Sequence, residues 1–91
     1  MEEFLIYLRD VKNYSELTIE SYHNDLVEFF NFVNKGYEST TKEDVKAYLK
    51  YLFDKDNSNR TVSRKISTLK SFYRYLKDND LVSTNVMASI K

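Results

Sequence analysis

The sequence predicts an all-α domain, and three observations support this prediction. The 91 residues include one Gly and no Pro, which leaves few places for tight turns and favours helices joined by short polar loops. Apolar residues recur every three or four positions in four successive segments, as on one face of a helix. No segment shows the apolar–polar alternation that is typical of a strand. The length fits a single domain with a modest core.

The first two helices are expected at about residues 2–12 and 15–33. Ser15 is the expected N-cap of the second, because a serine hydroxyl can accept a hydrogen bond from a free N–H of the first turn. Gly36 is expected to end that helix just beyond its last turn. The inward stripes are predicted to be Phe4, Leu5, Leu8 and Val11 in the first helix, and Ile19, Tyr22, Leu26, Phe29, Phe30 and Val33 in the second.

The third helix is expected to begin after Thr41, with Asp44 three residues on in a capping-box arrangement. Residues 54–59 form a polar loop, in which Asn57, Ser58 or Asn59 can cap a fourth helix that runs to about Asp78. The predicted inward residues are Val45, Tyr48, Leu49 and Leu52 in the third helix, and Val62, Ile66, Leu69, Phe72, Tyr73 and Leu76 in the fourth.

A short tail follows the fourth helix. Leu81 and Val82 are expected to pack under the bundle, and Thr84 is expected to cap a last helical turn over residues 85–90.

Charge is unevenly distributed along a chain whose net charge is zero. Residues 1–34 carry two basic and seven acidic side chains, residues 35–59 carry five of each, and residues 60–91 carry seven basic and two acidic ones. The segment 60–77 holds six basic side chains and no acidic one. At about 100° per residue, its outward side carries Arg60, Ser63, Arg64, Ser67, Lys70, Ser71 and Arg74.

A helix face with cations and no carboxylate is typical of contact with a polyanion, because neutralising phosphates releases condensed counterions. Ordinary surface helices interleave both signs of charge, so the simple alternative of a solvated face fits less well. Two observations oppose the nucleic-acid interpretation: the pI of about 6.6 is low for a free-standing binder, and the second helix is acidic.

Composition excludes several classes of function. Without Cys there is neither a disulfide framework nor a thiolate metal site, and a reducing cytoplasm is the expected location. No apolar run is long enough to cross a bilayer. The single histidine, His23, is expected to be an exposed helix residue, and no cluster has metal-ligand spacing. Neither a cofactor nor a small-molecule substrate is expected, and Tyr22, Tyr48 and Tyr73 are expected to be core aromatics.

Three segments in series resemble the N-terminal core-binding (SAM-like) domain of tyrosine recombinases and phage integrases of the Xer type. Residues 15–33 read SELTIESYHNDLVEFFNFV and resemble the pattern S-x-x-T-x-x-x-Y-x-x-D-L-x-x-F. Residues 40–52 read TTKEDVKAYLKYL and match the family's middle helix. Residues 61–91 read TVSRKISTLKSFYRYLKDNDLVSTNVMASIK and resemble T-x-x-R-x-x-S-x-L-(K/R)-x-F. One departure is Val86, since the family has Asn-Pro where this chain has Asn85-Val86.

The resemblance implies a bundle of four or five helices that forms one jaw of a clamp around duplex DNA. The other jaw would be the catalytic domain of the same parent chain, so residues 1–91 are expected to be an excised core-binding domain without catalytic residues. In the family the second and fourth helices face the duplex. By matched position, the DNA-contacting residues would be Thr18, Ser21 and Asn24 on the second helix, and Arg60, Thr61, Arg64, Lys65 and Thr68 on the fourth, with the ammonium of Lys65 extending outwards from the edge of the apolar stripe. Lys70 and Arg74 are added as expected DNA contacts because they lie on the outward cationic side of the same helix.

A rival interpretation is a helical protein–protein interaction module. In that case the acidic first half of one molecule would contact the basic fourth helix of another. The two interpretations can coexist, because recombinases of this family assemble on DNA.

Overall fold

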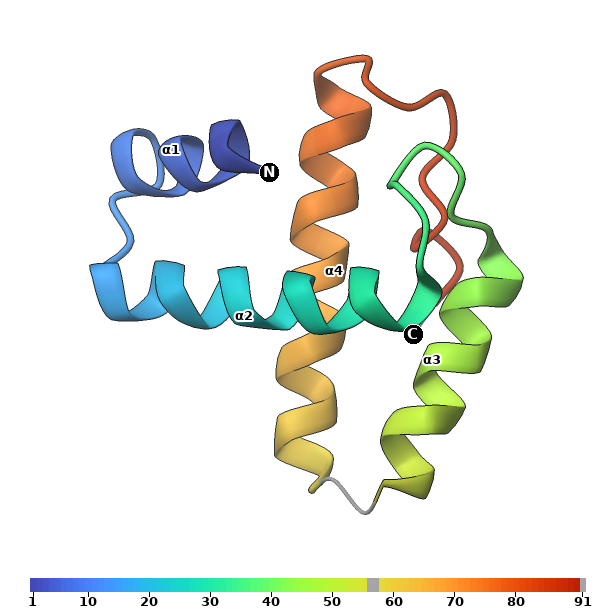
Figure 1. The fold of residues 1–91 in the computed structure, drawn as a ribbon. Coiled ribbons are helices and arrows are strands. Elements are labelled where there is room, and N and C mark those ends of the chain that lie inside the picture. Colours follow the sequence, from blue (N-terminus) through green and yellow to red (C-terminus); the bar gives the residue numbers. More distant parts are fainter. Residues whose placement is uncertain (56–57, 91) are drawn as a thin grey trace.

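The computed structural model describes residues 1–55 and 58–90 of the chain. It contains four helices: α1 (Glu2–Asp10), α2 (Glu16–Val33), α3 (Lys42–Asp54) and α4 (Asn59–Asp78). No strand occurs in these described ranges, which confirms the all-α prediction. Helices α1 and α2 run antiparallel as one hairpin, α3 and α4 form a second, and α2 lies across α4 (Figure 1).

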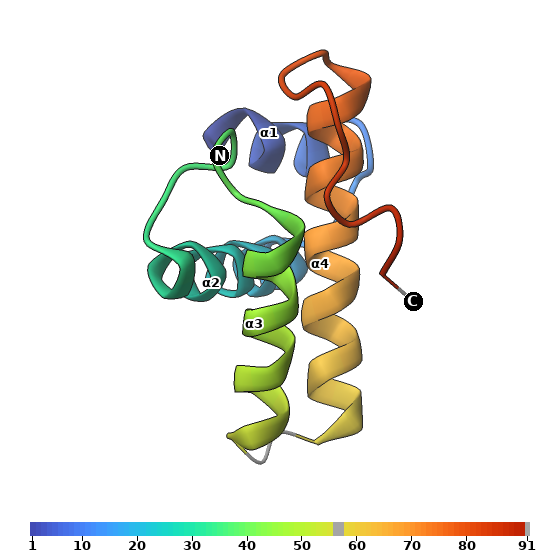
Figure 2. The same ribbon diagram turned by 90° about the vertical axis from the view of Figure 1, so that its right-hand side faces the viewer.

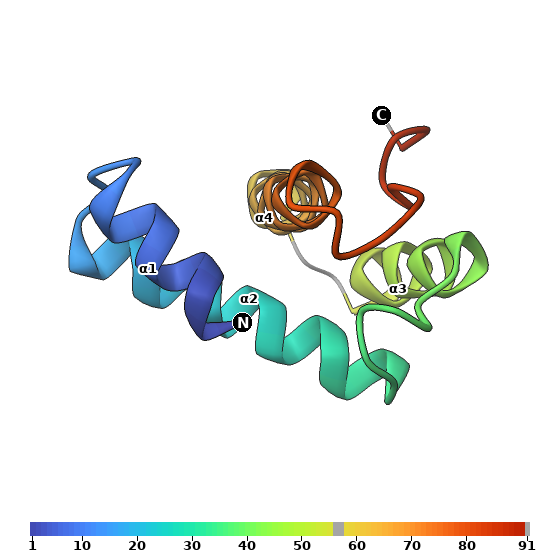
Figure 3. The ribbon, with the colours of Figure 1, turned by 90° about the horizontal axis from the view of Figure 1, so that it is seen from above.

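Two further views show how the hairpins share one core. Helices α3 and α4 lie side by side, and the segment after α4 returns along the bundle (Figure 2). Seen nearly along the axis of α4, helix α2 passes across it while α1 lies on the same side as α2 (Figure 3). Helix α2 therefore contacts each of the other three helices, and it is the element that joins the two hairpins.

The helix starts follow the predicted capping residues. Ser15 accepts a hydrogen bond from the backbone N–H of Thr18 at 3.2 Å, and Ser58 accepts the equivalent bond from Thr61 at 3.2 Å. Thr41 and the third residue of α3, Asp44, form the reciprocal capping box. Ser15 and the Thr41 box are thus confirmed, and Ser58 is the cap among the three candidates for α4. The candidate Asn57 lies outside the described residues.

The helix ends differ from expectation in two places. Helix α1 ends at Asp10 rather than near Lys12. Helix α2 is ended by Asn34, which adopts the left-handed conformation with φ 54°, and not by Gly36. Asparagine tolerates this conformation better than most residues with a side chain, so the glycine two positions later is not needed as the cap.

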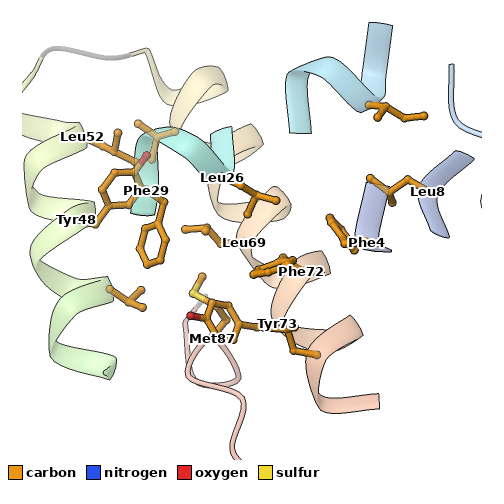
Figure 4. Packing of buried hydrophobic residues seen from close by; sticks show 14 residues of the cluster. Phe4, Leu8, Leu26, Phe29, Tyr48, Leu52, Leu69, Phe72, Tyr73 and Met87 are labelled. Atoms are coloured by element: carbon orange, nitrogen blue, oxygen red, sulfur yellow. The ribbon is translucent and has the colours of Figure 1, made fainter. Parts of the chain in front are cut away.

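The core is one cluster built mainly from the predicted stripes. Tyr48 and Tyr73 are completely buried, as expected for core aromatics. Their hydroxyls find polar partners: Tyr48 donates to Glu28 at 3.0 Å, and Tyr73 donates to the backbone carbonyl of Tyr37 at 3.2 Å. The buried apolar residues, most of them shown in Figure 4, are Phe4, Leu8, Ile19, Leu26, Phe29, Val45, Tyr48, Leu52, Val62, Leu69, Phe72, Tyr73, Leu76 and Met87.

The tail contributes to this core in a way that was only partly foreseen. Val82 packs against the core, but Leu81 is largely exposed. The buried residue is Met87, which was not predicted. Its backbone N–H donates to the side chain of Asn85 at 2.9 Å, so Asn85 rather than Thr84 caps the last turn. Residues 86–89 form turns closed by i→i+3 hydrogen bonds, which agrees with a short helical turn after α4.

Candidate nucleic-acid interface

The outer side of α4 presents a row of cationic side chains to solvent. Arg60 and Arg74 are exposed, Arg64 has a side chain that is 52 % exposed, and Lys70 is half-buried. Small residues stand between them, because Ser63 and Ser67 are also exposed on this helix. We refer to Arg60, Arg64, Lys70 and Arg74 as the α4 cation row.

Members of the α4 cation row differ in their intramolecular partners. Arg74 lies 3.8 Å from Asp78 one turn on, and both side chains are well exposed, so solvent weakens this attraction. Within residues 1–55 and 58–90, no ion pair involves Arg60 or Lys70. Arg64 is different, since it is bound to a buried carboxylate of α2.

That carboxylate is Asp25, which is only 4 % exposed. Arg64 donates to it twice, from Nη2 to Oδ1 at 2.9 Å and from Nε to Oδ2 at 3.2 Å. The hydroxyl of Thr68 lies 2.9 Å from the same Oδ2, and 3.1 Å from the backbone carbonyl of Arg64. A buried charge is costly unless it is paired and hydrogen-bonded, and these contacts satisfy that requirement.

A second pair lies one turn further along α2. Glu28 accepts hydrogen bonds from Lys65 of α4 and, at 3.0 Å, from the hydroxyl of Tyr48 of α3, while Lys55 lies 3.8 Å from its other oxygen. Partial burial by itself would raise the pKa of Glu28. The hydrogen bonds from Lys65 and Tyr48, together with the charges of Lys65 and Lys55, outweigh that effect and lower the pKa. Glu28 therefore joins three helices through a charged group.

These two pairs place some predicted contact residues inside the protein. Thr68 is 1 % exposed and is directed to Asp25. Lys65 has a side chain that is 11 % exposed, and its ammonium binds Glu28 instead of extending into solvent as expected. Every buried side-chain nitrogen or oxygen in the described part of the chain has a hydrogen-bond partner. In this conformation, Lys65 and Thr68 hold α2 against α4.

The predicted residues of α2 lie at the surface beside this junction. The spacing of Thr18, Ser21, Asp25 and Glu28 places all four along one side of the helix. Thr18 is exposed and Ser21 is half-buried, so this side continues from the Asp25–Arg64 pair towards the start of α2. Asn24 is exposed as well, on a neighbouring side of the helix. A surface groove there is lined by Asn24, Val27, Glu28, Asn31, Phe32, Tyr51 and Lys55.

Helices α2 and α4 begin with the same local structure. The cap serine donates its hydroxyl hydrogen to the threonine three residues on, at 3.0 Å for both Ser15–Thr18 and Ser58–Thr61. Each threonine oxygen therefore acts as an acceptor and keeps its own hydroxyl hydrogen available as a donor. Thr18 and Thr61, which were predicted as contacts from the resemblance, occupy equivalent positions in the first turns of the two helices.

The positions of charged residues on the apolar stripes of α2 and α4 already indicate buried charged contacts in the sequence. Asp25 lies three residues after Tyr22, next to Leu26 and four before Phe29, so its side chain falls on the apolar stripe of α2. Thr68 and Lys65 border the apolar stripe of α4 in the same way. A carboxylate inside one stripe and a cation at the edge of another indicate charged contacts buried between the two helices, although this pattern does not show that Asp25 pairs with Arg64 and Lys65 with Glu28.

Other chemistry finds little support in the described residues. His23 is exposed, as predicted. No group of three or more His, Cys, Asp or Glu residues in residues 1–55 and 58–90 is arranged to hold a metal ion. Nor does any helix within those ranges combine the length and apolar character needed to cross a membrane.

The four-helix fold is that of the helical N-terminal domain of a phage integrase. Residues 1–80 match the family model for the phage integrase, N-terminal SAM-like domain, and the chain belongs to that family. No solved structure matches the chain.

Among curated proteins the chain is similar to tyrosine recombinase XerC. It is 40 % identical over 87 residues to that of Staphylococcus epidermidis, 42 % over 88 residues to that of Listeria innocua, and 40 % over 86 residues to that of Bacillus pumilus. These alignments cover 90–92 % of the chain but 28–29 % of each relative. The chain therefore spans under a third of the length of these relatives.

Proposed function

We propose that this chain is the DNA-binding domain of a site-specific tyrosine recombinase. It clamps duplex DNA through α2 and α4 and so positions a separate catalytic domain, in which the cutting and joining of strands takes place. The α4 cation row carries this proposal, because it presents four basic side chains along one side of a helix that has no carboxylate before Asp78. Family membership and the relatives named as recombinases support it.

The proposed contacts are the surface members of the predicted set. Arg60, Arg64, Lys70 and Arg74 contact backbone phosphates, and Arg64 or Arg60 can in addition reach a guanine edge with two donors. Hydrogen bonds to the same DNA backbone are donated by the polar side chains of Thr18, Ser21, Asn24 and Thr61. Lys65 and Thr68, which the resemblance grouped with these residues, are buried and bind Glu28 and Asp25 inside the protein, so neither is a proposed DNA contact.

The electrostatic part of the proposal is tested by titrating the chain with a labelled mixed-sequence duplex of about 30 base pairs. Neutralising about four phosphates predicts that raising salt from about 50 to 200 mM weakens binding on the order of one hundredfold. Fluorescence anisotropy at several salt concentrations measures this dependence. Binding that is insensitive to salt would contradict a phosphate interface.

Alanine variants of Arg60 and Arg74 test whether α4 is the helix that binds DNA. These two arginines have no buried partner in the described residues. Each should weaken binding about uniformly across DNA sequences and reduce the slope of affinity against salt by about one ion. Lys46→Ala is the matched control, because it removes one exposed cation from α3. If Arg60→Ala and Arg74→Ala bind as tightly as Lys46→Ala, α4 is not the DNA-binding helix.

Self-association on DNA is a second proposal, and the charge asymmetry of the chain favours it. Two acidic side chains of the first half, Asp25 and Glu28, are however occupied by cations of the same molecule. The free acidic surface for a neighbouring α4 is therefore smaller than the sequence predicts. Sedimentation with and without the duplex tests this: oligomers that form without DNA and dissociate in salt would support the interaction module instead of the clamp.

A further inference from the structure

We infer that Asp25 is a positioning residue for Arg64: it fixes the guanidinium on α4 so that its outer edge is ready to bind a backbone phosphate of duplex DNA. This inference rests on the proposed function. It concerns a residue of α2 that lies under the interface rather than on it, since Asp25 is nearly completely buried.

The geometry of the pair leaves part of Arg64 free. A guanidinium has five N–H donors, and Asp25 takes one from Nε and one from Nη2. The two hydrogens on Nη1 and the second hydrogen on Nη2 remain. These lie on the edges not facing Asp25, and the side chain is 52 % exposed. The Nη1–Nη2 edge can therefore bind a phosphate with two parallel hydrogen bonds while Asp25 holds the other edge.

The carboxylate is itself held in place, which makes it a suitable anchor. Asp25 sits within the apolar stripe of α2, between residues that pack into the core, and the hydroxyl of Thr68 binds its Oδ2 at 2.9 Å. Arginine has many rotamers in solution and loses side-chain entropy when a contact fixes it. Because Asp25 has already fixed Arg64, less of that loss occurs when DNA binds.

The second ion pair provides an internal comparison. Glu28 lies three residues after Asp25 on the same side of α2, carries the same charge and also pairs with a cation of α4. Its partner Lys65 is buried, so it has no exposed edge to offer to DNA. Replacing Asp25 or Glu28 by its amide removes one negative charge and so reduces the repulsion of DNA equally. Glu28→Gln therefore measures this general electrostatic effect without the loss of an anchor for Arg64.

The test compares Asp25→Asn with Glu28→Gln in the full 91-residue chain, using the labelled 30-base-pair duplex at fixed salt. Glu28→Gln should bind as tightly as the unmodified chain or slightly more tightly. Asp25→Asn should bind about two- to tenfold more weakly than Glu28→Gln, which corresponds to the entropy of one immobilised side chain. The loss should vanish when Arg64 is already Ala, because the two residues act as a unit.

A spectroscopic readout accompanies the titration. In the free protein the Nε–H of Arg64 should give a slowly exchanging signal in ¹H–¹⁵N spectra, and Asp25→Asn should broaden or remove it. If Asp25→Asn does not fold, Thr68→Val carries the test, since it removes one hydrogen bond from Asp25 and keeps the charge. It should give a smaller loss of affinity in the same direction.

The outcomes separate this inference from the proposed function. Equal binding by Asp25→Asn and Glu28→Gln, or a loss that persists unchanged when Arg64 is Ala, would overturn positioning while the effects of Arg60→Ala and Arg74→Ala still stand. Unchanged binding by those two arginine variants would instead remove the DNA-binding role of α4, and the inference with it.

Discussion

Helix α4 packs against its neighbours through different chemistry at its two ends. Towards the start of α4, Asp25 and Glu28 of α2 bind Arg64 and Lys65 through directional charged contacts. Towards its end, α4 contacts aromatic rings of both α1 (Phe4) and α2 (Phe30). There, ring centroids lie 5.1 Å apart for Phe4–Phe72, 5.2 Å for Phe4–Tyr75 and 5.9 Å for Phe30–Phe72. We refer to these as the charged junction and the aromatic junction.

The two junctions contribute differently to the domain, one mainly to its stability and the other mainly to the geometry of charged side chains. Aromatic rings bury much apolar area and gain from edge-to-face contact, so the aromatic junction supplies stability. Buried ion pairs add little net stability, because desolvation offsets most of the attraction, but they fix the geometry of the groups involved. The charged junction therefore fixes the side chains that take part in it more than it adds stability, and three variants test this difference between the junctions.

The largest effect is expected at the aromatic junction. Phe72→Ala removes a nearly completely buried ring that contacts Phe4, Phe30 and Tyr73, and it should lower the free energy of unfolding by about 3–5 kcal/mol. Urea denaturation followed by circular dichroism measures this value. Phe53→Ala is the control, because that ring is largely exposed and its loss should change stability by no more than about 0.5 kcal/mol.

A smaller loss is expected at the charged junction. Glu28→Ala leaves the ammonium of Lys65 buried without its main partner, and it should cost about 2–3 kcal/mol. This is less than for a fully buried pair, since the side chain of Glu28 is 27 % exposed. The double variant Glu28→Met, Lys65→Met should recover most of the loss in the same urea assay. If the double variant stays as unstable as Glu28→Ala, the ion pair adds net stability, which would contradict the view that the charged junction contributes little to it.

The smallest effect depends on pH. The pKa of Glu28 is lowered below its ordinary value of 4.5 in the folded protein, so its contribution to stability is complete above about pH 4.5 and is lost as pH falls through the folded value. The stability difference between the unmodified chain and Glu28→Gln should therefore shrink between pH 7 and pH 3. The loss of unfolding free energy caused by Phe72→Ala should stay constant over the same pH range, because that substitution removes no titrating group. Parallel urea titrations at several pH values measure both differences.

The helices and their starts could be predicted from the sequence because they depend on neighbours in the chain. The serine caps, the Thr41–Asp44 box and the apolar stripes all involve residues within a few positions of one another. The last residue of α2, Val33, was predicted correctly, but the residue that closes the helix was wrong. Asn34 and Gly36 both suit a left-handed conformation, and sequence alone does not rank them.

The candidate site was less predictable because its contacts join residues far apart in the sequence. Asp25 and Arg64 are 39 positions apart, and Glu28 and Lys65 are 37 apart. Charge counted along the chain treats each helix separately, so it showed an acidic α2 and a basic α4 but not that they neutralise each other at the crossing. The resemblance identified positions, and only the packing of α2 on α4 distinguishes the surface residues Arg60 and Arg64 from the buried Thr68.

The segment after α4 affects where the domain can be divided. The family match ends at residue 80, yet the returning chain inserts Met87 among the core side chains, with Val82 and Val86 packed beside it. Shortening the polypeptide at residue 80 would open a hole next to the aromatic rings and admit water to the bundle. Truncated variants of this chain should therefore end no earlier than residue 90.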